Sequence, residues 1–248
     1  MSGKLIVIEG LDGSGKATQS GLLADGLIAE GARVRRISFP NYESPSSALV
    51  KMYLGGAFGS DPDAVNAYAA SSFYAVDRYA GYKADWGGFY RDGGIVIADR
   101  YTTANAVHQC CKLPESQWDE FLDWLFRFEY EQLGIPAPAL VIYLRMDVDA
   151  SQALMMNRYH GDAGKKDIHE SNLDYLRRAQ RAAEYCAVRF GWTVIPCFDG
   201  GRLRSVEEIQ ADVARAAQRA IQEKKTTEPP SRFLCTAEGA LCVSKKTF

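Results

Sequence analysis

The amino-acid sequence predicts a three-layer α/β fold, in which a parallel sheet of about five strands carries helices on both faces. Short apolar runs with the length of a buried strand recur along the chain, and segments of helical length separate them. Strands that alternate with helices form right-handed crossovers, which make neighbouring strands parallel. The 248 residues suffice for one sizeable domain and would crowd two.

The strands follow one another at regular intervals. The first expected strand, Lys4–Glu9, reads KLIVIE and suits burial on both faces. Further strands are expected at 33–39, 94–98, 140–144 and 193–197.

Helical patterns occupy the intervals between the strands. Helices are expected at 16–30, 46–54, 62–90 with a break, 115–133, 150–158, 171–190 and 205–222. Gly31 ends the first of them, and Asp149 is interpreted as the N-cap of the helix at 150–158. Within 115–133 most large apolar residues form one core-facing stripe. Trp124 and Phe128 lie off this stripe and are candidates for a subunit contact.

Two segments stand apart from this pattern. The segment 158–171 is charged and contains glycine, and we expect it to form a small lid-like surface loop. Residues 223–248 form a C-terminal tail to which no chemistry is assigned. One domain is therefore expected over residues 1–222.

Composition and charge argue against several classes of protein. The formal net charge of −2 does not favour a nucleic-acid-binding or membrane-surface protein, because both usually carry a basic excess. The six cysteines lack zinc-site spacing, which argues against a structural metal. The sequence shows neither a secretory leader nor an apolar run long enough to cross a bilayer. We therefore expect a cytoplasmic protein with reduced thiols.

A phosphate-binding motif lies between the first strand and the first helix. The segment 10–16 reads GLDGSGK and matches GxxxxGK in the strand-loop-helix context that this motif requires. Glycines let successive N–H groups point at an anion, the helix N-terminus adds positive potential, and Lys16 neutralises β- and γ-phosphates. The expected ATP-binding residues are Gly10, Leu11, Asp12, Gly13, Ser14, Gly15, Lys16, Ala17 and Thr18.

Ala17 departs from the usual motif. The residue after the lysine is normally Ser or Thr, whose hydroxyl binds Mg²⁺. With alanine there, phosphate oxygens, water and acidic residues elsewhere would have to hold the metal. Asp99 is the candidate outer ligand, through water, because it ends a buried strand beside the motif. Arg100 follows it and can form a forked contact with a phosphate, although such a pair is more often an ordinary salt bridge.

Two motifs together resemble the thymidylate kinase family of bacterial-type P-loop nucleoside monophosphate kinases. They are GLDGSGKATQ at 10–19 and DRYTTANAVHQ at 99–109. The resemblance runs from about residue 4 to 222 and includes FPNY at 39–42, FYAVDR at 73–78 and the lid-like segment. It implies a P-loop kinase fold, transfer of the ATP γ-phosphoryl group to dTMP with Mg²⁺, and a homodimer.

The resemblance also implies roles for single residues. Asp12 would contact the sugar 3′-hydroxyl, Arg100 the acceptor phosphate, and Tyr74 and Arg78 the thymine ring and its carbonyl. The residues implied for dTMP binding are Asp12, Phe39, Tyr42, Tyr74, Arg78, Arg100, Ala104, His108 and Gln109. The residues implied for catalysis are Lys16, Asp99, Arg100, Arg158, Lys165 and Lys166, of which the last three are cations of the lid-like segment.

Two positions depart from the family pattern. Ala104 stands where the family has a serine, and Tyr42 stands where many members have an arginine near the acceptor phosphate. Phosphate binding would then depend more on Arg100 and on the lid.

The expected reaction is in-line phosphoryl transfer, in which the protein positions two anions and neutralises their charge. No general base is needed, since a phosphate oxygen is already nucleophilic. Two alternatives stay open: a deoxynucleoside kinase or another nucleotide kinase, and a nucleotide-binding protein that has lost catalysis. Profiling of acceptor substrates would distinguish the first alternative from a dTMP kinase. Magnesium-dependent turnover would exclude the second.

Overall fold

A computed structural model describes residues 3–158, 169, 172–199 and 201–222, with only the backbone of residues 153 and 155–158. Its centre is a five-stranded parallel sheet with the strand order β2-β3-β1-β4-β5. The strands are β1 (Lys4–Glu9), β2 (Val34–Ser38), β3 (Ile95–Asp99), β4 (Leu140–Arg145) and β5 (Thr193–Pro196). Because β1 pairs with both β3 and β4, the loop after β1 opens at the middle of the sheet's carboxyl edge.

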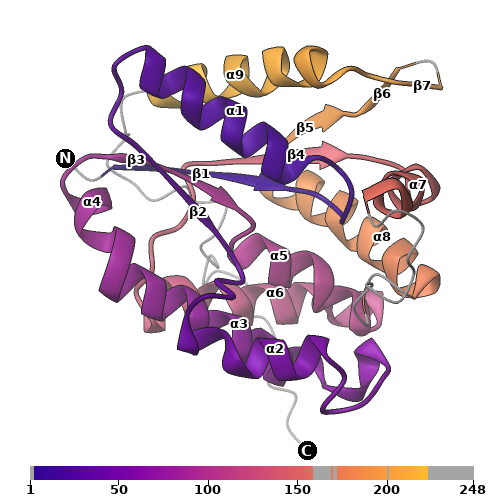
Figure 1. The fold of residues 1–248 in the computed structure, drawn as a ribbon. Coiled ribbons are helices and arrows are strands. Elements are labelled where there is room, and N and C mark those ends of the chain that lie inside the picture. Colours follow the sequence, from indigo (N-terminus) through magenta and orange to yellow (C-terminus); the bar gives the residue numbers. More distant parts are fainter. Residues whose placement is uncertain (1–2, 159–168, 170–171, 200, 223–248) are drawn as a thin grey trace, which may run out of the picture.

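Helices cover both faces of the sheet (Figure 1). One face carries α1 (Lys16–Ala29) and α9 (Val206–Gln222). The helices on the other side are α2 (Ala48–Leu54), α3 (Ala67–Gly81), α4 (Gly87–Arg91), α5 (Thr102–His108), α6 (Trp118–Phe126) and α8 (Leu173–Phe190). The helix α7 (Val148–Arg158) follows β4 and contacts α8. The predicted three-layer fold with about five parallel strands is confirmed.

Two apolar cores lie on either side of the sheet. Alternate side chains of β1 point to opposite faces, as the pleat of a strand requires. Ile6 and Ile8 pack in the core under α1 and α9, whereas Leu5 and Val7 pack in the core under α5, α6 and α8. This burial on both faces explains why KLIVIE reads as one unbroken apolar run.

The predicted helices differ from the observed ones in detail. The expected helix at 62–90 is a 3-10 turn at 62–64, two non-helical residues, and then α3, a π-helical turn (Tyr82–Trp86) and α4 in continuous succession. The expected break therefore lies at 65–66. The helix expected at 115–133 is α6 with a π-helical extension, Arg127–Gln132. Short 3-10 turns occupy Pro45–Ser47, Pro62–Ala64, Cys110–Lys112 and Glu115–Gln117.

The prediction of Asp149 as an N-cap is wrong. The side chain of Asp147 accepts hydrogen bonds from the backbone N–H groups of Asp149 (2.9 Å) and Ala150 (3.4 Å), so the cap lies two residues earlier. The helix α5 and a small hairpin of β6 (Phe198–Asp199) and β7 (Arg202–Leu203) were not predicted. Within the described part of the chain, every helix is too short or too polar to cross a membrane.

Candidate active site

The phosphate-binding loop has the backbone conformation that its glycines allow. Gly13 and Gly15 have φ values of 82° and 87°, which a side chain would disfavour. Lys16 opens α1 and is 7% exposed, and its ammonium donates a 2.8 Å hydrogen bond to the carbonyl of Leu11. The lysine therefore curls back over its own loop, where a phosphate of a bound nucleotide would lie.

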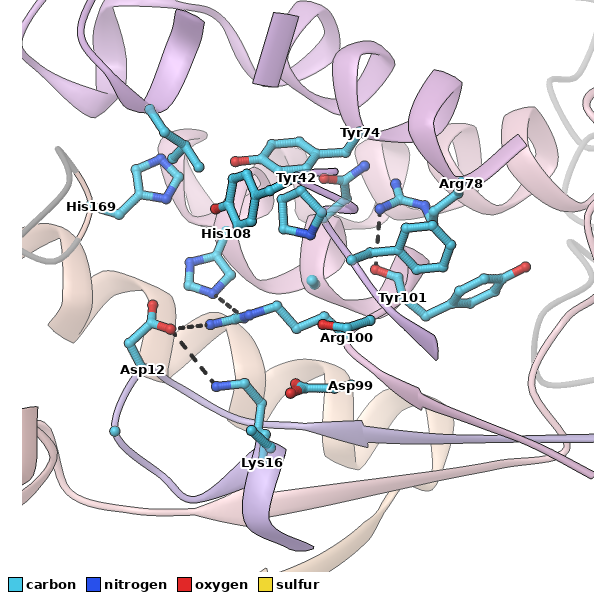
Figure 2. A pocket seen from close by; sticks show the side chains of 18 of the residues that line it. Asp12, Lys16, Tyr42, Tyr74, Arg78, Asp99, Arg100, Tyr101, His108 and His169 are labelled. Atoms are coloured by element: carbon cyan, nitrogen blue, oxygen red, sulfur yellow. Dashed lines mark hydrogen bonds and ion pairs between the residues drawn. The ribbon is translucent and has the colours of Figure 1, made fainter. Parts of the chain in front are cut away.

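Arg100 is the centre of the charged cluster at the end of β3 (Figure 2). Its guanidinium donates to Asp12 at 2.5 Å, lies 3.6 Å from Glu9, and is 3.0 Å from Nε2 of His108. Among the described residues it is the one non-glycine with positive φ, at 68°. Such a backbone costs roughly 1–3 kcal/mol and is retained where the surroundings fix it, as at functional sites. This backbone conformation directs the Arg100 side chain toward Asp12 of the phosphate-binding loop.

The charges of this cluster support one another. Burial disfavours the charged form of Arg100, but the carboxylates of Asp12 and Glu9 outweigh it and raise the pKa of the guanidinium. Burial likewise opposes ionisation of Asp12, yet Arg100 and Lys16 hold its pKa well below the usual range. For Lys16 and Glu9 burial is the larger effect: it lowers the pKa of the lysine and raises that of the glutamate. A bound polyphosphate would add the negative charge that favours the ammonium of Lys16.

A cavity of about 750 Å³ brings the two predicted motifs together. Its lining includes Asp12, Gly13, Gly15, Lys16, Ala17 and Thr18 from the loop side. It also includes the metal-ligand candidate Asp99 and every predicted dTMP-binding residue outside the loop: Phe39, Tyr42, Tyr74, Arg78, Arg100, Ala104, His108 and Gln109. Gly10, Leu11 and Ser14 belong to the loop but do not line the cavity. The predicted cations Lys165 and Lys166 lie outside the described residues, as does the side chain of Arg158.

Tyr74 and Arg78 reach the cavity from one face of α3. Arg78 is 1% exposed and forms a two-pronged ion pair with Glu129, with both bonds at 2.6 Å. Its remaining terminal nitrogen lies 3.4 Å from the carbonyl of Tyr101. Thr102 also donates to Glu129, at 2.8 Å. These contacts hold the Arg78 side chain in one position. Glu129 is a partner that sequence reasoning missed.

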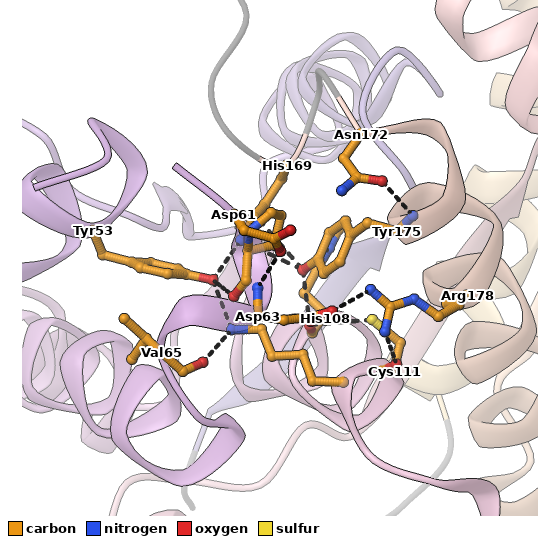
Figure 3. Close-up of polar contacts among 12 residues, drawn as sticks. Tyr53, Asp61, Asp63, Val65, His108, Cys111, His169, Asn172, Tyr175 and Arg178 are labelled. Atoms are coloured by element: carbon orange, nitrogen blue, oxygen red, sulfur yellow. Dashed lines mark hydrogen bonds and ion pairs between the residues drawn. The ribbon is translucent and has the colours of Figure 1, made fainter. Parts of the chain in front are cut away.

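Sequence reasoning also missed a buried polar network behind His108 (Figure 3). The ring of His108 stacks on that of His169 at 5.8 Å, and the hydroxyl of Tyr175 donates to the His108 carbonyl at 2.8 Å. Nε2 of His169 is 2.8 Å from the hydroxyl of Tyr53, which also accepts from Lys112 at 2.7 Å. Burial, reinforced by the Lys112 cation, lowers the pKa of His169 to about 3. This histidine is therefore neutral near pH 7.

Known proteins resemble this chain over most of its length. A family model described as thymidylate kinase matches residues 8–196. The chain belongs to the thymidylate kinase family. It is 31% identical to the thymidylate kinase of Mycobacterium tuberculosis over 205 residues, covering 80% of this chain and 94% of that protein. It is 27% identical to the human thymidylate kinase over 234 residues, covering 92% and 95% of the two chains.

A solved structure supports the fold. The thymidylate kinase of Candida albicans superposes with a TM-score of 0.65 at 19% identity, covering 88% of this chain and 92% of that one. Family membership identifies the chain as a nucleoside monophosphate kinase that phosphorylates dTMP with ATP as the donor. Its substrates are small nucleotides, and the family match does not favour the alternatives of a deoxynucleoside kinase or a catalytically degenerate protein.

Proposed function

We propose that the loop around Lys16 binds the triphosphate of ATP and that Arg100 binds the 5′-phosphate of dTMP opposite it. The observation that carries this assignment is the shared carboxylate of Asp12. One of its oxygens lies 3.9 Å from the Lys16 ammonium and 2.5 Å from the Arg100 guanidinium. Lys16, proposed to bind ATP, and Arg100, proposed to bind dTMP, are therefore close enough for a phosphoryl group to pass from one nucleotide to the other.

The acceptor side has the chemistry to recognise a nucleoside. Tyr74 offers an aromatic face for the thymine ring, and base–aromatic stacking is worth about 1–3 kcal/mol. Arg78 is the donor proposed to read a base carbonyl, since Glu129 keeps it in place. Asp12 would accept from the sugar 3′-hydroxyl. Phe39, Tyr42, Ala104, His108 and Gln109 complete the proposed pocket.

We propose Mg²⁺ as the second cofactor. Asp99 is 9% exposed and lines the cavity together with Lys16, so it could order a metal-bound water. In the part of the chain that the structure describes, three or more His, Cys, Asp or Glu side chains nowhere gather to cage a metal. This donor set still fits Mg²⁺, which commonly uses one or two carboxylates together with substrate phosphates and water. When bound, the metal would neutralise charge on the donor oxygens.

The chemistry needs positioning more than proton transfer. An acceptor phosphate oxygen forms a bond to the γ-phosphorus while the bond between that phosphorus and the β,γ-bridging oxygen breaks, which leaves ADP and dTDP. Lys16 and the loop N–H groups stabilise the charge that develops on the donor. Arg100 holds the nucleophile in line. We assign the lid cations Arg158, Lys165 and Lys166 to the transferring group.

Substitution of Lys16 tests the donor assignment. We expect Lys16→Ala to reduce turnover by at least about 10³-fold, because the main cation at the β- and γ-phosphates is lost, and to leave the fold intact. ADP release and thermal melting measure the two effects. Lys83→Ala removes an exposed lysine away from the cavity and serves as the matched control. Near-wild-type turnover of Lys16→Ala would refute the assignment.

We further propose a homodimer in the cytoplasm. Exposed apolar side chains gather on α2 and α3: Leu49, Met52, Tyr68, Val76 and Tyr79. Trp124 lies 4.7 Å from the Tyr68 ring and stacks on Phe128 at 5.3 Å, so the side chains predicted for a subunit contact adjoin this face. Exposed large apolar side chains on neighbouring helices favour a protein partner. The cytoplasmic location agrees with small, water-soluble nucleotide substrates.

A further inference from the structure

Arg36 is a cavity residue to which no role has been given. It lies in β2, where side chains alternate between the two faces of the sheet. Ile37 points into the core under α5 and α6, so Arg36 and Ser38 point to the opposite face, which α1 covers. Both line the same cavity as Lys16, and Arg36 is exposed there.

The guanidinium of Arg36 lies on the first turn of α1. One of its terminal nitrogens donates a 3.0 Å hydrogen bond to the carbonyl of Ala17. The other terminal nitrogen would be only 3.3 Å from a Cβ atom added to Gly21, one turn further along α1. The small residues Ala17 and Gly21 therefore form the shallow slot that lets an arginine from β2 lie this close to the phosphate-binding loop.

Among the residues that the structure describes, no carboxylate forms an ion pair with Arg36. Its neighbour Arg35 forms an ion pair with Asp85, and Arg33 lies over the ring of Phe89 at 5.4 Å. Arg36, in contrast, forms no ion pair with any residue that the structure describes. A guanidinium has five N–H donors, and the bond to Ala17 uses one of them. The remaining donors are available to an anion in the cavity.

We propose that Arg36 binds a phosphate oxygen of the ATP donor on the Ala17 side of the loop. This inference rests on the proposed placement of ATP at Lys16. In most P-loop proteins a Ser or Thr hydroxyl follows the lysine and serves the metal–phosphate unit from this side. Alanine provides no such group, whereas a guanidinium beside the same residue provides charge and directed donors. Arg36 thus binds substrate and is a further residue of the donor site.

The alternative role for Arg36 is structural, because its bond to Ala17 also ties β2 to α1. The two roles differ in what they change. A phosphate ligand affects ATP affinity and leaves dTMP affinity and stability nearly constant. A structural tie affects the melting temperature and both substrates together.

The test compares Arg36→Ala and Arg36→Lys with Arg35→Ala, which removes an arginine from the opposite face of the same strand. Binding of a non-hydrolysable ATP analogue is measured by calorimetry, the KM values for ATP and dTMP by ADP release, and the melting temperature alongside. We expect Arg36→Ala to weaken ATP binding about tenfold or more, the usual effect of losing a charge-assisted hydrogen bond. The KM for dTMP should stay within about twofold. Arg36→Lys should recover part of the loss, because it keeps the charge, and Arg35→Ala should resemble the wild type.

Two results would overturn the proposal. One is unchanged ATP binding in Arg36→Ala; the other is a parallel loss of both affinities together with a lower melting temperature. Lys16→Ala separates this failure from failure of the donor site itself. If Lys16→Ala weakens binding of the analogue and Arg36→Ala does not, only the inference about Arg36 is wrong. If neither variant weakens it, ATP binds elsewhere.

Discussion

At the scale of single residues, the pairing of Arg78 with Glu129 fixes one wall of the cavity. Both side chains are almost fully buried, at 1% and 0% exposure. A buried ion pair contributes little net stability when intact, but removal of one partner leaves an uncompensated charge in a poorly solvated site. The pair therefore holds Arg78 in place at the cavity, and breaking it should carry a large penalty in stability.

This penalty can be measured with Glu129→Gln. We expect the free energy of unfolding to fall by about 3–5 kcal/mol, because Arg78 loses its counter-charge inside the protein. The KM for dTMP should rise in whatever fraction stays folded. Glu131→Gln, which alters an exposed carboxylate two residues away, provides the matched control for urea denaturation. Equal stability of the two variants would show that Arg78 does not depend on Glu129.

Sequence reasoning identified the cavity residues that belong to local motifs. Lys16, Asp99 and Arg100 could be predicted because each stands at the end of a strand or the start of a helix. Glu129 and His169 could not. Their importance comes from partners distant in the sequence, such as Arg78 with Glu129, 51 residues apart, and Tyr53 with His169, 116 residues apart. No spacing rule relates such positions before the fold is known.

At the scale of elements, packing overrides local preference in α5. This short helix begins with Thr102 and Thr103 and contains Val107, β-branched residues that weakly disfavour helices. It was not predicted from the sequence. Burial of nearly all its side chains stabilises it, and its contacts with α8 are extensive. Because α5 carries Ala104 and His108, the proposed acceptor pocket depends on an element that only tertiary structure explains.

The contact of His169 with α2, α5 and α8 makes stability depend on pH. Burial keeps the pKa of His169 at about 3 in the folded protein, whereas the unfolded chain titrates near 6.5. The unfolded state therefore binds the extra proton as pH falls below about 6.5. The free energy of unfolding should decrease by up to about 1.4 kcal/mol per pH unit from this group.

Denaturation of the wild type and of His169→Asn between about pH 7 and pH 4 measures this contribution. The variant should lose less stability on acidification, because its neutral amide does not titrate. His108, whose pKa is also lowered, mainly by burial, remains in both proteins. The variant should therefore keep part of the dependence of the unfolding free energy on pH. Identical slopes in the two proteins would show that His169 is solvated and protonates freely in the folded state.

At the scale of the whole molecule, the alternation of strands and helices was enough to predict the architecture. An unbroken apolar strand followed by a glycine loop and a helix is compatible with few other folds. The strand order places β1 between β3 and β4. This order brings Lys16 and Arg100 to neighbouring strand ends, so the fold itself creates the site. The domain boundary at residue 222 and the lid at 158–171 remain predictions, because these segments lie largely outside the described residues.

We propose that one cavity binds ATP at Lys16 and a thymidine monophosphate at Arg100. A coupled ADP-release assay with ATP and Mg²⁺ tests it most directly, using thymidine and the monophosphates of thymidine, deoxyuridine, uridine, cytidine and adenosine as acceptors. We expect dTMP to stimulate ADP release most strongly, whereas thymidine, which has no phosphate for Arg100, should not stimulate it. Release stimulated by thymidine but not by dTMP would contradict this proposal.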